Sequence, residues 1–290
     1  MPRVAVITDS TSSLPRPLYA QYEIAMVPYY VHIEGRALRD TVDLTTEAFC
    51  RYLSSLPDDS QLPTTACPGP GDYLEAFVAA AERARDIISI HMTSIASGAY
   101  QAAQVGREMA LERLRGVRIS VVDTRNVSMC HGWLSLQAAR AAFDGASLDD
   151  VLALVQRLMP HTRMFQTGDT LRYLYMGGRI GRAKHLLASV LNIRPIVSMD
   201  DGVITAAGVS RSRAGSLQRI SAFVERAVGL GQRARIALTH AGALPDAEAL
   251  RAKLEQVIEP VEVLMCELSP ALTVHSGPGT VGVCYLAERG

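Results

Sequence analysis

The side chains best suited to chemistry in this sequence are hydroxyls and a histidine that stand close to glycines. Ser97-Gly98 falls where a helix is expected to begin, and a hydroxyl beside free N–H groups at the positive end of a helix can hold a small anion. Thr65 lies in the stretch PTTACPGPG, and His275 opens the segment HSGPGTVG. The sequence therefore offers hydrogen-bond donors for a carboxylate or a phosphate.

The last six residues of HSGPGTVG match the G-x-G-x-x-G spacing of a dinucleotide-binding loop. That loop needs a helix directly after its glycines, because the helix N-terminus binds the pyrophosphate. Only VCYLAERG follows Gly282, and residues 281–286 read as a final strand. We therefore exclude a nucleotide site here. Two interpretations stay open: a plain turn with a capping histidine, or a turn that lets the backbone approach a ligand while His275 contacts it.

A serine hydrolase is one alternative, with Ser97 as nucleophile, His275 as base, and Asp123 or Asp9 as the third member. Triads are recognised by geometry and not by order along the chain, so the sequence permits this arrangement. Ser97 lacks the G-x-S-x-G elbow, however, and this counts against the hydrolase. We expect no catalytic residue.

A metal-dependent enzyme is a second alternative, using Asp9, Asp123, and His91 or His275. The sequence contains no pair of ligands at a helical metal spacing such as H-x-x-x-H. We therefore expect no metal ion and no cofactor.

The elements that must position these side chains alternate in the first half of the chain. Strand cores such as AVI, IISI and ISVV are apolar without alternation, as in a sheet that is covered on both faces. The expected strands are 4–8, 27–33, 87–92 and 118–122, and the expected helices are 45–56, 72–85, 97–114, 127–143 and 148–159. This alternation predicts parallel β-α-β units, with ligands at the carboxyl ends of the strands.

The second half mixes helices with a hairpin, which Asp200-Asp201-Gly202 signals. We expect strands at 162–166, 193–199, 203–209, 234–239, 261–265 and 281–286, and helices at 171–176, 184–191, 216–228 and 246–256. The fold class is α/β with two domains, an N-terminal parallel-sheet α/β domain (1–160) and a C-terminal α+β domain (161–290). The boundary is expected near Pro160-His161.

Composition narrows the functional classes. The formal net charge is zero, which lacks the basic footprint of a nucleic-acid-binding protein. Five scattered cysteines without a C-x-x-C motif favour a reducing compartment over a disulfide framework. The N-terminus is unlike a signal peptide, and no apolar stretch approaches the length of a membrane span. We expect a cytoplasmic monomer.

Five segments, in order along nearly the whole chain, resemble motifs of the bacterial DegV family of fatty-acid-binding proteins. They are VITDSTSSLP, PTTACPGPGDY, SIASGAYQAA, LRYLYMGGRIGR and HSGPGTVGV. The resemblance implies a two-domain fold that holds one long-chain fatty acid in a tunnel between the domains. It also implies a protein that performs no chemistry itself and presents the carboxylate to a separate fatty-acid kinase, which forms the acyl phosphate.

The resemblance places the carboxylate against Thr65, Ser97, Gly98 and His275, with Arg179 and Ser94 behind them. The sequence departs from the family pattern at three positions near the head group, which are Ala66, Cys67 and Ala99. Two hydroxyls and an amide of that pattern are therefore absent. Candidates for the tunnel walls, which ordinary core packing explains equally well, are Leu171, Leu174, Leu187, Val190 and Ile193.

The physical division of labour in such a complex is simple. Burial of a methylene contributes about 0.8 kcal/mol, so a sixteen-carbon chain contributes on the order of 11 kcal/mol before ordering costs. A dry, unpaired carboxylate would cost several kcal/mol, so the head group needs hydrogen-bond donors. The tail supplies affinity and the head group supplies orientation.

Overall fold

The computed structural model describes residues 4–57, 60–188 and 193–288, without the side chains of 186–188. Four strands of the first half form one parallel sheet in the order β2-β1-β6-β7. These strands are β1 (Val4–Asp9), β2 (Ala25–Val27), β6 (Asp86–His91) and β7 (Arg118–Asp123). The predicted parallel sheet is confirmed, and the fold class is α/β.

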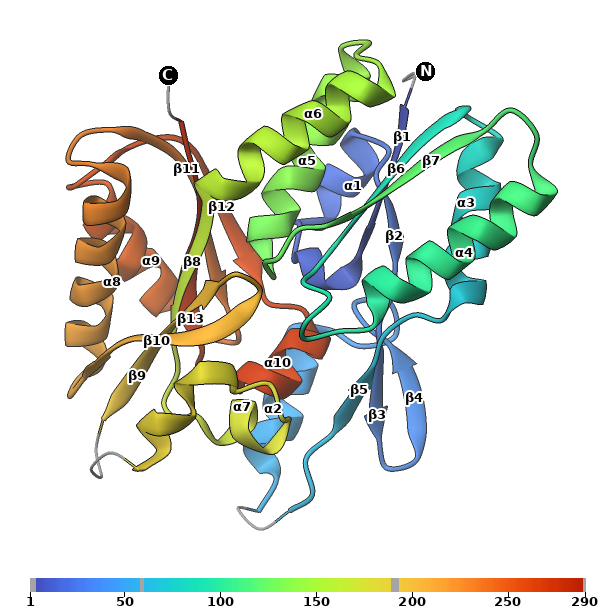
Figure 1. Cartoon of the computed structure of the whole chain (residues 1–290). Helices are drawn as coiled ribbons and strands as arrows, with labels where there is room; N and C mark the ends of the chain where they lie inside the picture. The colour runs from blue at the N-terminus through green and yellow to red at the C-terminus, as the bar shows by residue number, and fades with distance from the viewer. Residues whose placement is uncertain (1–3, 58–59, 189–192, 289–290) are drawn as a thin grey trace.

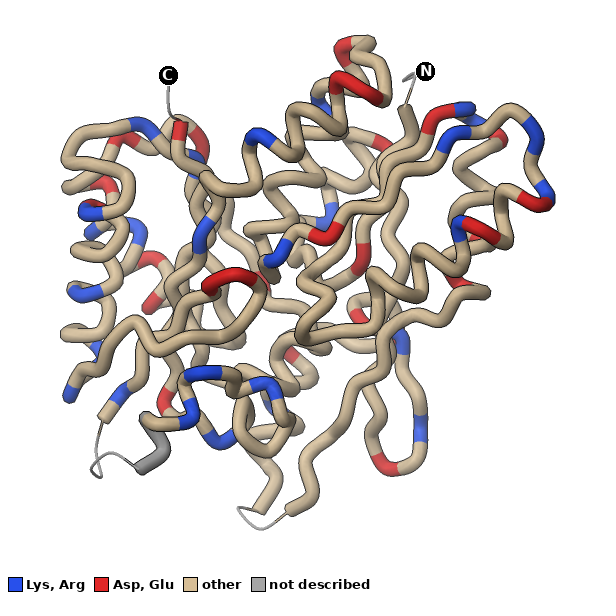
Figure 2. The backbone as a smooth tube through the Cα atoms, in the orientation of Figure 1, with Lys and Arg blue, Asp and Glu red and all other residues tan. Residues whose placement is uncertain are grey.

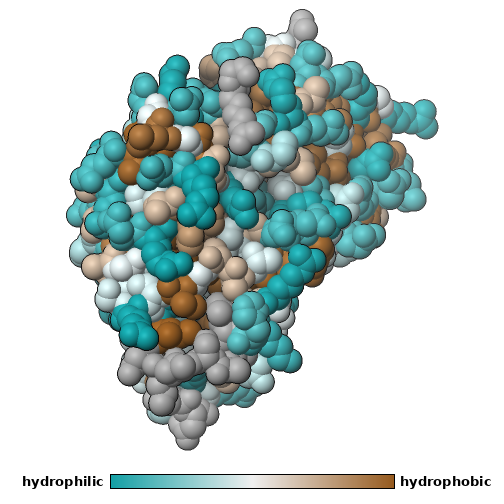
Figure 3. Space-filling view, turned by 60° about the vertical axis from the view of Figure 1, so that its left-hand side comes forward, coloured by the Kyte–Doolittle hydropathy of each residue, from teal (hydrophilic) through white to brown (hydrophobic). Residues whose placement is uncertain are grey.

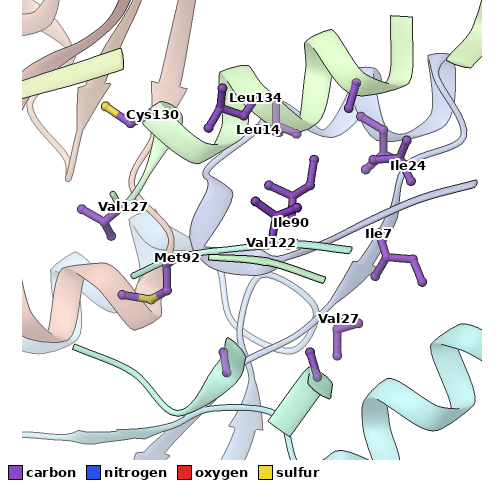
Figure 4. Packing of buried hydrophobic residues seen from close by; sticks show 14 of the residues in the cluster. Ile7, Leu14, Ile24, Val27, Ile90, Met92, Val122, Val127, Cys130 and Leu134 are labelled. Atoms are coloured by element: carbon purple, nitrogen blue, oxygen red, sulfur yellow. The ribbon is translucent and has the colours of Figure 1, made fainter. Parts of the chain in front are cut away.

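Helices cover both faces of this parallel sheet (Figure 1). They are α1 (Arg16–Gln21), α3 (Pro70–Ala81), α4 (Ala99–Arg113), α5 (Met129–Phe143) and α6 (Leu148–Leu158). All six residues of β1 are buried, as the unbroken apolar run predicts. Figure 4 shows Leu134 and Cys130 of α5 in the same buried cluster as Ile90 of β6, the core that this helix forms with the strands.

Local sequence signals account for where these helices begin. Ser147 and Asp150 form a capping box at the start of α6, with the Ser147 hydroxyl accepting from the Asp150 N–H. Pro70 occupies the first turn of α3, where its missing N–H costs nothing. Tyr73 and Phe77 follow at helical spacing, and both are fully buried.

The second half forms a six-stranded mixed sheet in the order β10-β9-β8-β13-β11-β12. Its strands are β8 (Thr162–Thr167), β9 (Arg194–Asp200), β10 (Val203–Ser210), β11 (Arg233–His240), β12 (Glu259–Glu267) and β13 (Val281–Ala287). The predicted hairpin joins β9 to β10, and Asp201 and Gly202 take the positive φ values that its tight turn requires. α8 (Arg213–Val228) and α9 (Leu244–Leu254) pack on this sheet (Figure 1).

A small sheet with the order β4-β3-β5 extends below the parallel sheet and corrects one prediction (Figure 1). Its strands are β3 (Tyr30–Ile33), β4 (Arg36–Arg39) and β5 (Thr64–Ala66). The single strand expected over 27–33 is wrong, because the chain leaves the parallel sheet at Tyr29, whose N–H bonds to Ser10 Oγ. The strand that carries Thr65, β5, pairs with β3.

The segments around His275 and Gly177 also differ from expectation. His275 lies in the last turn of a helix that was not predicted, α10 (Pro270–Ser276), and not in a bare turn. Ser269 caps this helix and Pro270 opens it, so the signal was present but short. α7 (Arg172–Met176) is found as predicted, whereas the helix expected over 184–191 is a 3-10 segment, η3 (Gly181–Ala188), and residues 189–191 lie outside the described part. α2 (Thr46–Ser55) matches its prediction.

An ion-pair network ties the two sheets together. The Arg140 guanidinium of α5 donates to both carboxylate oxygens of Glu262 on β12, over 2.8 and 2.6 Å. Arg235 of β11 donates to the same carboxylate over 2.8 Å. The expected boundary at 160–161 falls in η2 (Met159–His161), between α6 and β8. Division into two domains there stays a proposal.

The exterior is mostly polar on the face that Figure 3 shows, with apolar side chains in separate small patches. Among the described residues, no helix combines the length and the apolar character needed to cross a bilayer.

We expect Glu262→Gln to lower the free energy of unfolding by about 1–2 kcal/mol at neutral pH. The substitution removes the carboxylate partner of the partly buried Arg140 guanidinium and one of the two carboxylate partners of Arg235, which keeps Glu288. Glu259→Gln is the matched control, since the Glu259 side chain is 66% exposed and its contact with Arg233 is long, at 3.9 Å. Its effect is expected within about 0.5 kcal/mol. Urea unfolding of both variants measures the difference, and equal effects would contradict a role for the network.

Candidate functional site

A cavity of about 280 Å³ lies where the carboxyl-end loops of the parallel sheet meet α10 and the segment after α7. Both halves of the chain contribute to its wall, as expected for a ligand site between them. Its lining residues are Thr11, Tyr29, Thr65, Ala66, Cys67, Met92, Ala96, Ser97, Gly98, Arg179, Ala271, Leu272 and His275.

Five of the six predicted site residues line this one cavity: Thr65, Ser97, Gly98, Arg179 and His275. Ser94 does not join them. It is exposed, and its hydroxyl donates to Asp123 Oδ2 over 2.5 Å. Ser94 instead closes the loop after β6 onto the loop after β7.

Thr65 and His275, which are 210 positions apart, share a hydrogen bond of 2.9 Å between Oγ1 and Nε2. The Nδ1 atom of His275 is buried and has no hydrogen-bond partner in the described structure. Burial and the nearby Arg179 lower the pKa of His275 to about 4. The ring is therefore neutral at pH 7, and in the tautomer that carries the proton on Nε2 it donates to Thr65. The Thr65 hydroxyl is then free to donate into the cavity.

The Ser97 hydroxyl is also hydrogen-bonded to neighbouring groups of the protein, which differ from those at Thr65. Tyr29 OH lies 2.6 Å from Ser97 Oγ, and the Ala99 N–H donates to that oxygen over 3.3 Å. Burial, followed by the Asp9 charge, raises the pKa of Tyr29 well above its ordinary value, so the phenol keeps its proton. With Tyr29 donating, both acceptor sites of the Ser97 oxygen are occupied, and its own proton is available to a ligand.

Arg179 supplies a positive charge at the edge of the cavity. It is exposed, and its Nη1 donates to the Gly177 carbonyl over 2.7 Å. Figure 2 shows further Lys and Arg residues along α7 and η3, the segment that carries Arg179. This distribution favours an anionic ligand or an anionic partner at the cavity.

The arrangement suits a ligand that accepts hydrogen bonds and does not suit a hydrolytic reaction. Two hydroxyls arranged as donors match a carboxylate, which only accepts hydrogen bonds when it is ionised. A hydrolase would need His275 to accept the proton of Ser97, yet Nε2 of His275 is hydrogen-bonded to Thr65, and Ser97 Oγ is hydrogen-bonded to Tyr29 OH. In the described residues no carboxylate hydrogen-bonds to His275, so Ser97, His275 and Asp123 or Asp9 form no triad.

The Asp9 carboxylate interacts with buried groups of the protein. It is fully buried, and its carboxylate accepts from the backbone N–H and the hydroxyl of Thr11. His91 Nδ1 lies 2.9 Å from it and His131 Nε2 lies 3.6 Å from it. Burial alone would raise the pKa of Asp9, but the two histidines and their hydrogen bonds hold it well below the usual range. Asp9 therefore fixes Thr11 in the cavity wall.

The cluster around Asp9 does not support the metal-dependent enzyme. The described ranges contain no group of His, Cys, Asp and Glu side chains arranged to hold a metal ion. Asp123, the other carboxylate considered, is occupied by Ser94 and the Arg125 N–H.

Sequence reasoning missed Tyr29, which stands in none of the five motifs, and did not single out Thr11 within the motif VITDSTSSLP. The polar loop Asp9–Ser13 was visible after β1, but the role of Tyr29 depends on a break between strands that the sequence did not reveal. Ala66 and Cys67 do line the cavity, whereas Ala99 is buried inside α4.

The predicted tunnel walls are not found on this cavity. Leu171 is 7% exposed and packs in the core, together with Leu174. Ile193 is absent from the cavity lining. Val190 and the side chain of Leu187 lie outside the described part.

Asp40 anchors the helix that carries His275. It is fully buried, accepts from Ser10 Oγ over 2.6 Å, and accepts from the Ala271 N–H in the first turn of α10 over 3.0 Å. Burial raises the pKa of Asp40 to about 6, against the opposing effect of these hydrogen bonds. Ionised Asp40 is therefore a cost that the folded protein bears at neutral pH.

Because the pKa of Asp40 is about 6 in the folded protein, against 3.8 for an unperturbed aspartate, ionisation favours the unfolded chain as the pH rises from about 4 to about 6. Asp40→Asn removes this effect, so the variant should gain about 1–3 kcal/mol relative to the parent between pH 4 and pH 7. Denaturant unfolding at both values measures the gain. A difference that does not change with pH would refute the raised pKa.

Known proteins resemble this chain over almost its whole length. A family model described as uncharacterised protein, DegV family, matches residues 3–288. A DegV domain-containing protein of Deinococcus radiodurans is 32% identical over 281 residues, which cover 97% of each sequence.

Two solved structures add the same relationship in three dimensions. A DegV family protein from Thermus thermophilus, described by its fatty acid binding, superposes with a TM-score of 0.90 at 29% identity, covering 99% of this chain and 100% of that one. DegV of Bacillus subtilis, described as a fatty acid binding protein, gives 0.84 at 26%, with the same coverage. On the match of the family model and of these relatives, the chain belongs to the DegV family.

Proposed function

We propose that this protein binds a long-chain fatty acid in an apolar tunnel between its two halves and presents the carboxylate to a partner kinase, which forms the acyl phosphate. The protein itself is not the enzyme in this proposal. The observation that carries it is the pair of hydroxyls, Thr65 and Ser97, on one cavity: Thr65 Oγ1 lies 2.9 Å from His275 Nε2, and Ser97 Oγ lies 2.6 Å from Tyr29 OH and accepts from the Ala99 N–H. With the histidine and the phenol as donors, both hydroxyl protons are available to an anion.

The rest of the cavity fits the same ligand. Arg179 offers a positive charge, and the backbone N–H of Gly98 lies at the start of α4, where the helix dipole favours an anion. The apolar lining residues would contact the first methylenes of the chain. These are Ala66, Met92, Ala96, Ala271 and Leu272. The fatty acid binding described for the Thermus thermophilus and Bacillus subtilis proteins supports the choice of ligand.

The proposal extends to where and how the protein works. The described cysteines are all free thiols, and this supports a cytoplasmic location. We keep a monomer with domains 1–160 and 161–290 as part of the proposal.

Binding is tested by extracting the purified protein with organic solvent, identifying released acids by mass spectrometry, and titrating the stripped protein with a fluorescent fatty acid. We expect a released fatty acid and saturable binding. Thr65→Val removes the hydroxyl and keeps the shape, so it should weaken binding about tenfold, as expected for a lost hydrogen bond to a charged group. Thr64→Val is the matched control, because Thr64 is the exposed neighbour on β5. No released acid and no saturable binding would refute the proposed ligand.

Presentation to a kinase is tested by incubating the loaded protein with ATP and trapping acyl phosphate with hydroxylamine. The protein alone should yield no hydroxamate, because the cavity has neither a base for Ser97 nor a built nucleotide site. Addition of a fatty-acid kinase from the same organism should yield it. Hydroxamate from the protein alone would show that it is an enzyme, and none with the kinase would remove the presentation step.

A further inference from the structure

Two short helices meet at the cavity, and the residue that ends each of them is a glycine. Gly177 ends α7, and Gly277 ends α10. A Cβ placed on Gly177 would lie 2.3 Å from Nδ1 of His275, and one placed on Gly277 would lie 2.3 Å from the ring of Tyr173. Each helix therefore receives an aromatic ring from the other helix against a backbone that carries no side chain.

The two glycines are required for different reasons. Gly277 has φ of +82°, a conformation that disfavours any side chain regardless of the space available. Gly177 has φ of −74° and ψ of −5°, which alanine adopts without strain. The close approach of the His275 ring is thus the main reason for glycine at 177, followed by the Tyr173 carbonyl, 3.0 Å from that Cβ.

Gly177 also holds a second cavity residue. Its carbonyl accepts from Arg179 Nη1 over 2.7 Å, while a Cβ at this position would meet the Nδ1–Cε1 edge of the His275 ring, whose Nε2 bonds Thr65. The backbone at position 177 thereby limits where the side chains of both Arg179 and His275 can lie.

We propose that Gly177 is the positioning residue of the head-group cavity. The absence of a side chain at 177 allows the His275 ring to sit back far enough to bond Thr65, and the carbonyl of 177 aims Arg179 at the same cavity. A methyl group at 177 would push the ring toward the cavity and break its alignment with Thr65. The affinity aspect of this inference rests on the proposed fatty-acid binding.

The test is a double-mutant cycle with Gly177→Ala, His275→Ala and the combined variant, titrated with a fluorescent long-chain fatty acid. Gly177→Ala should weaken binding about tenfold or more in the parent protein. In the His275→Ala background it should have little further effect, because the ring that it displaces is gone. Gly71→Ala is the matched control, since nothing lies within 4 Å of a Cβ at that position, and it should bind like the parent. Additive effects of the two substitutions would overturn the proposal.

A second readout does not depend on the fatty acid. In protein labelled with ¹³C-histidine, the ring signal of His275 is identified by its loss in His275→Ala. Gly177→Ala should shift that signal and Gly71→Ala should not. An unshifted signal in Gly177→Ala overturns the positioning role. If that signal shifts but the parent protein binds no fatty acid, only the proposed function is refuted.

Loss of folding is also decisive. If Gly177→Ala fails to fold and the combined variant with His275→Ala folds, the clash with the ring is the cause and the proposal is supported. If both variants fail to fold, glycine at 177 serves the backbone alone and the proposal is wrong.

Discussion

The number of hydrogen bonds that a hydroxyl can accept is the constraint on which the site depends. Ser97 Oγ is next to Tyr29 OH and the Ala99 N–H, and Thr65 Oγ1 is next to Nε2 of a neutral His275. With Tyr29 and His275 as donors, each hydroxyl directs its proton toward the cavity. In the proposed complex, selectivity for an anion follows from this polarity, with the formal charge of Arg179 at the edge of the cavity.

That polarity is maintained by groups that never face the cavity. Burial and Arg179 keep His275 neutral, and burial with the Asp9 charge keeps Tyr29 protonated. Asp40 ties the first turn of α10 to Ser10, at the cost of a buried carboxylate that ionises reluctantly. The buried Asp40 carboxylate thus lowers the stability of the folded protein while it fixes the position of the helix that carries His275.

The departures from the family pattern fit this picture. Ala66 and Cys67 line the cavity without strong donors, since a thiol donates only weakly. In the proposed complex, recognition of the head group therefore falls on Thr65, Ser97 and the backbone of Gly98. Thr65 lies on β5, Ser97 lies in the loop before α4, and Gly98 is the N-cap of that helix.

The sequence by itself determined the parallel sheet, the helices on it other than α1, the β9–β10 hairpin and the family, because apolar periodicity, capping residues and turn glycines are local signals. It also indicated Thr65, Ser97, Gly98, Arg179 and His275, through their motifs. Only the tertiary structure decided that these five line one cavity, that Ser94 does not, that Tyr29 supports Ser97, and that α10 carries His275. Those outcomes depend on contacts between residues as far as 210 positions apart, and no local pattern encodes which distant partner fills the acceptor site of a given hydroxyl.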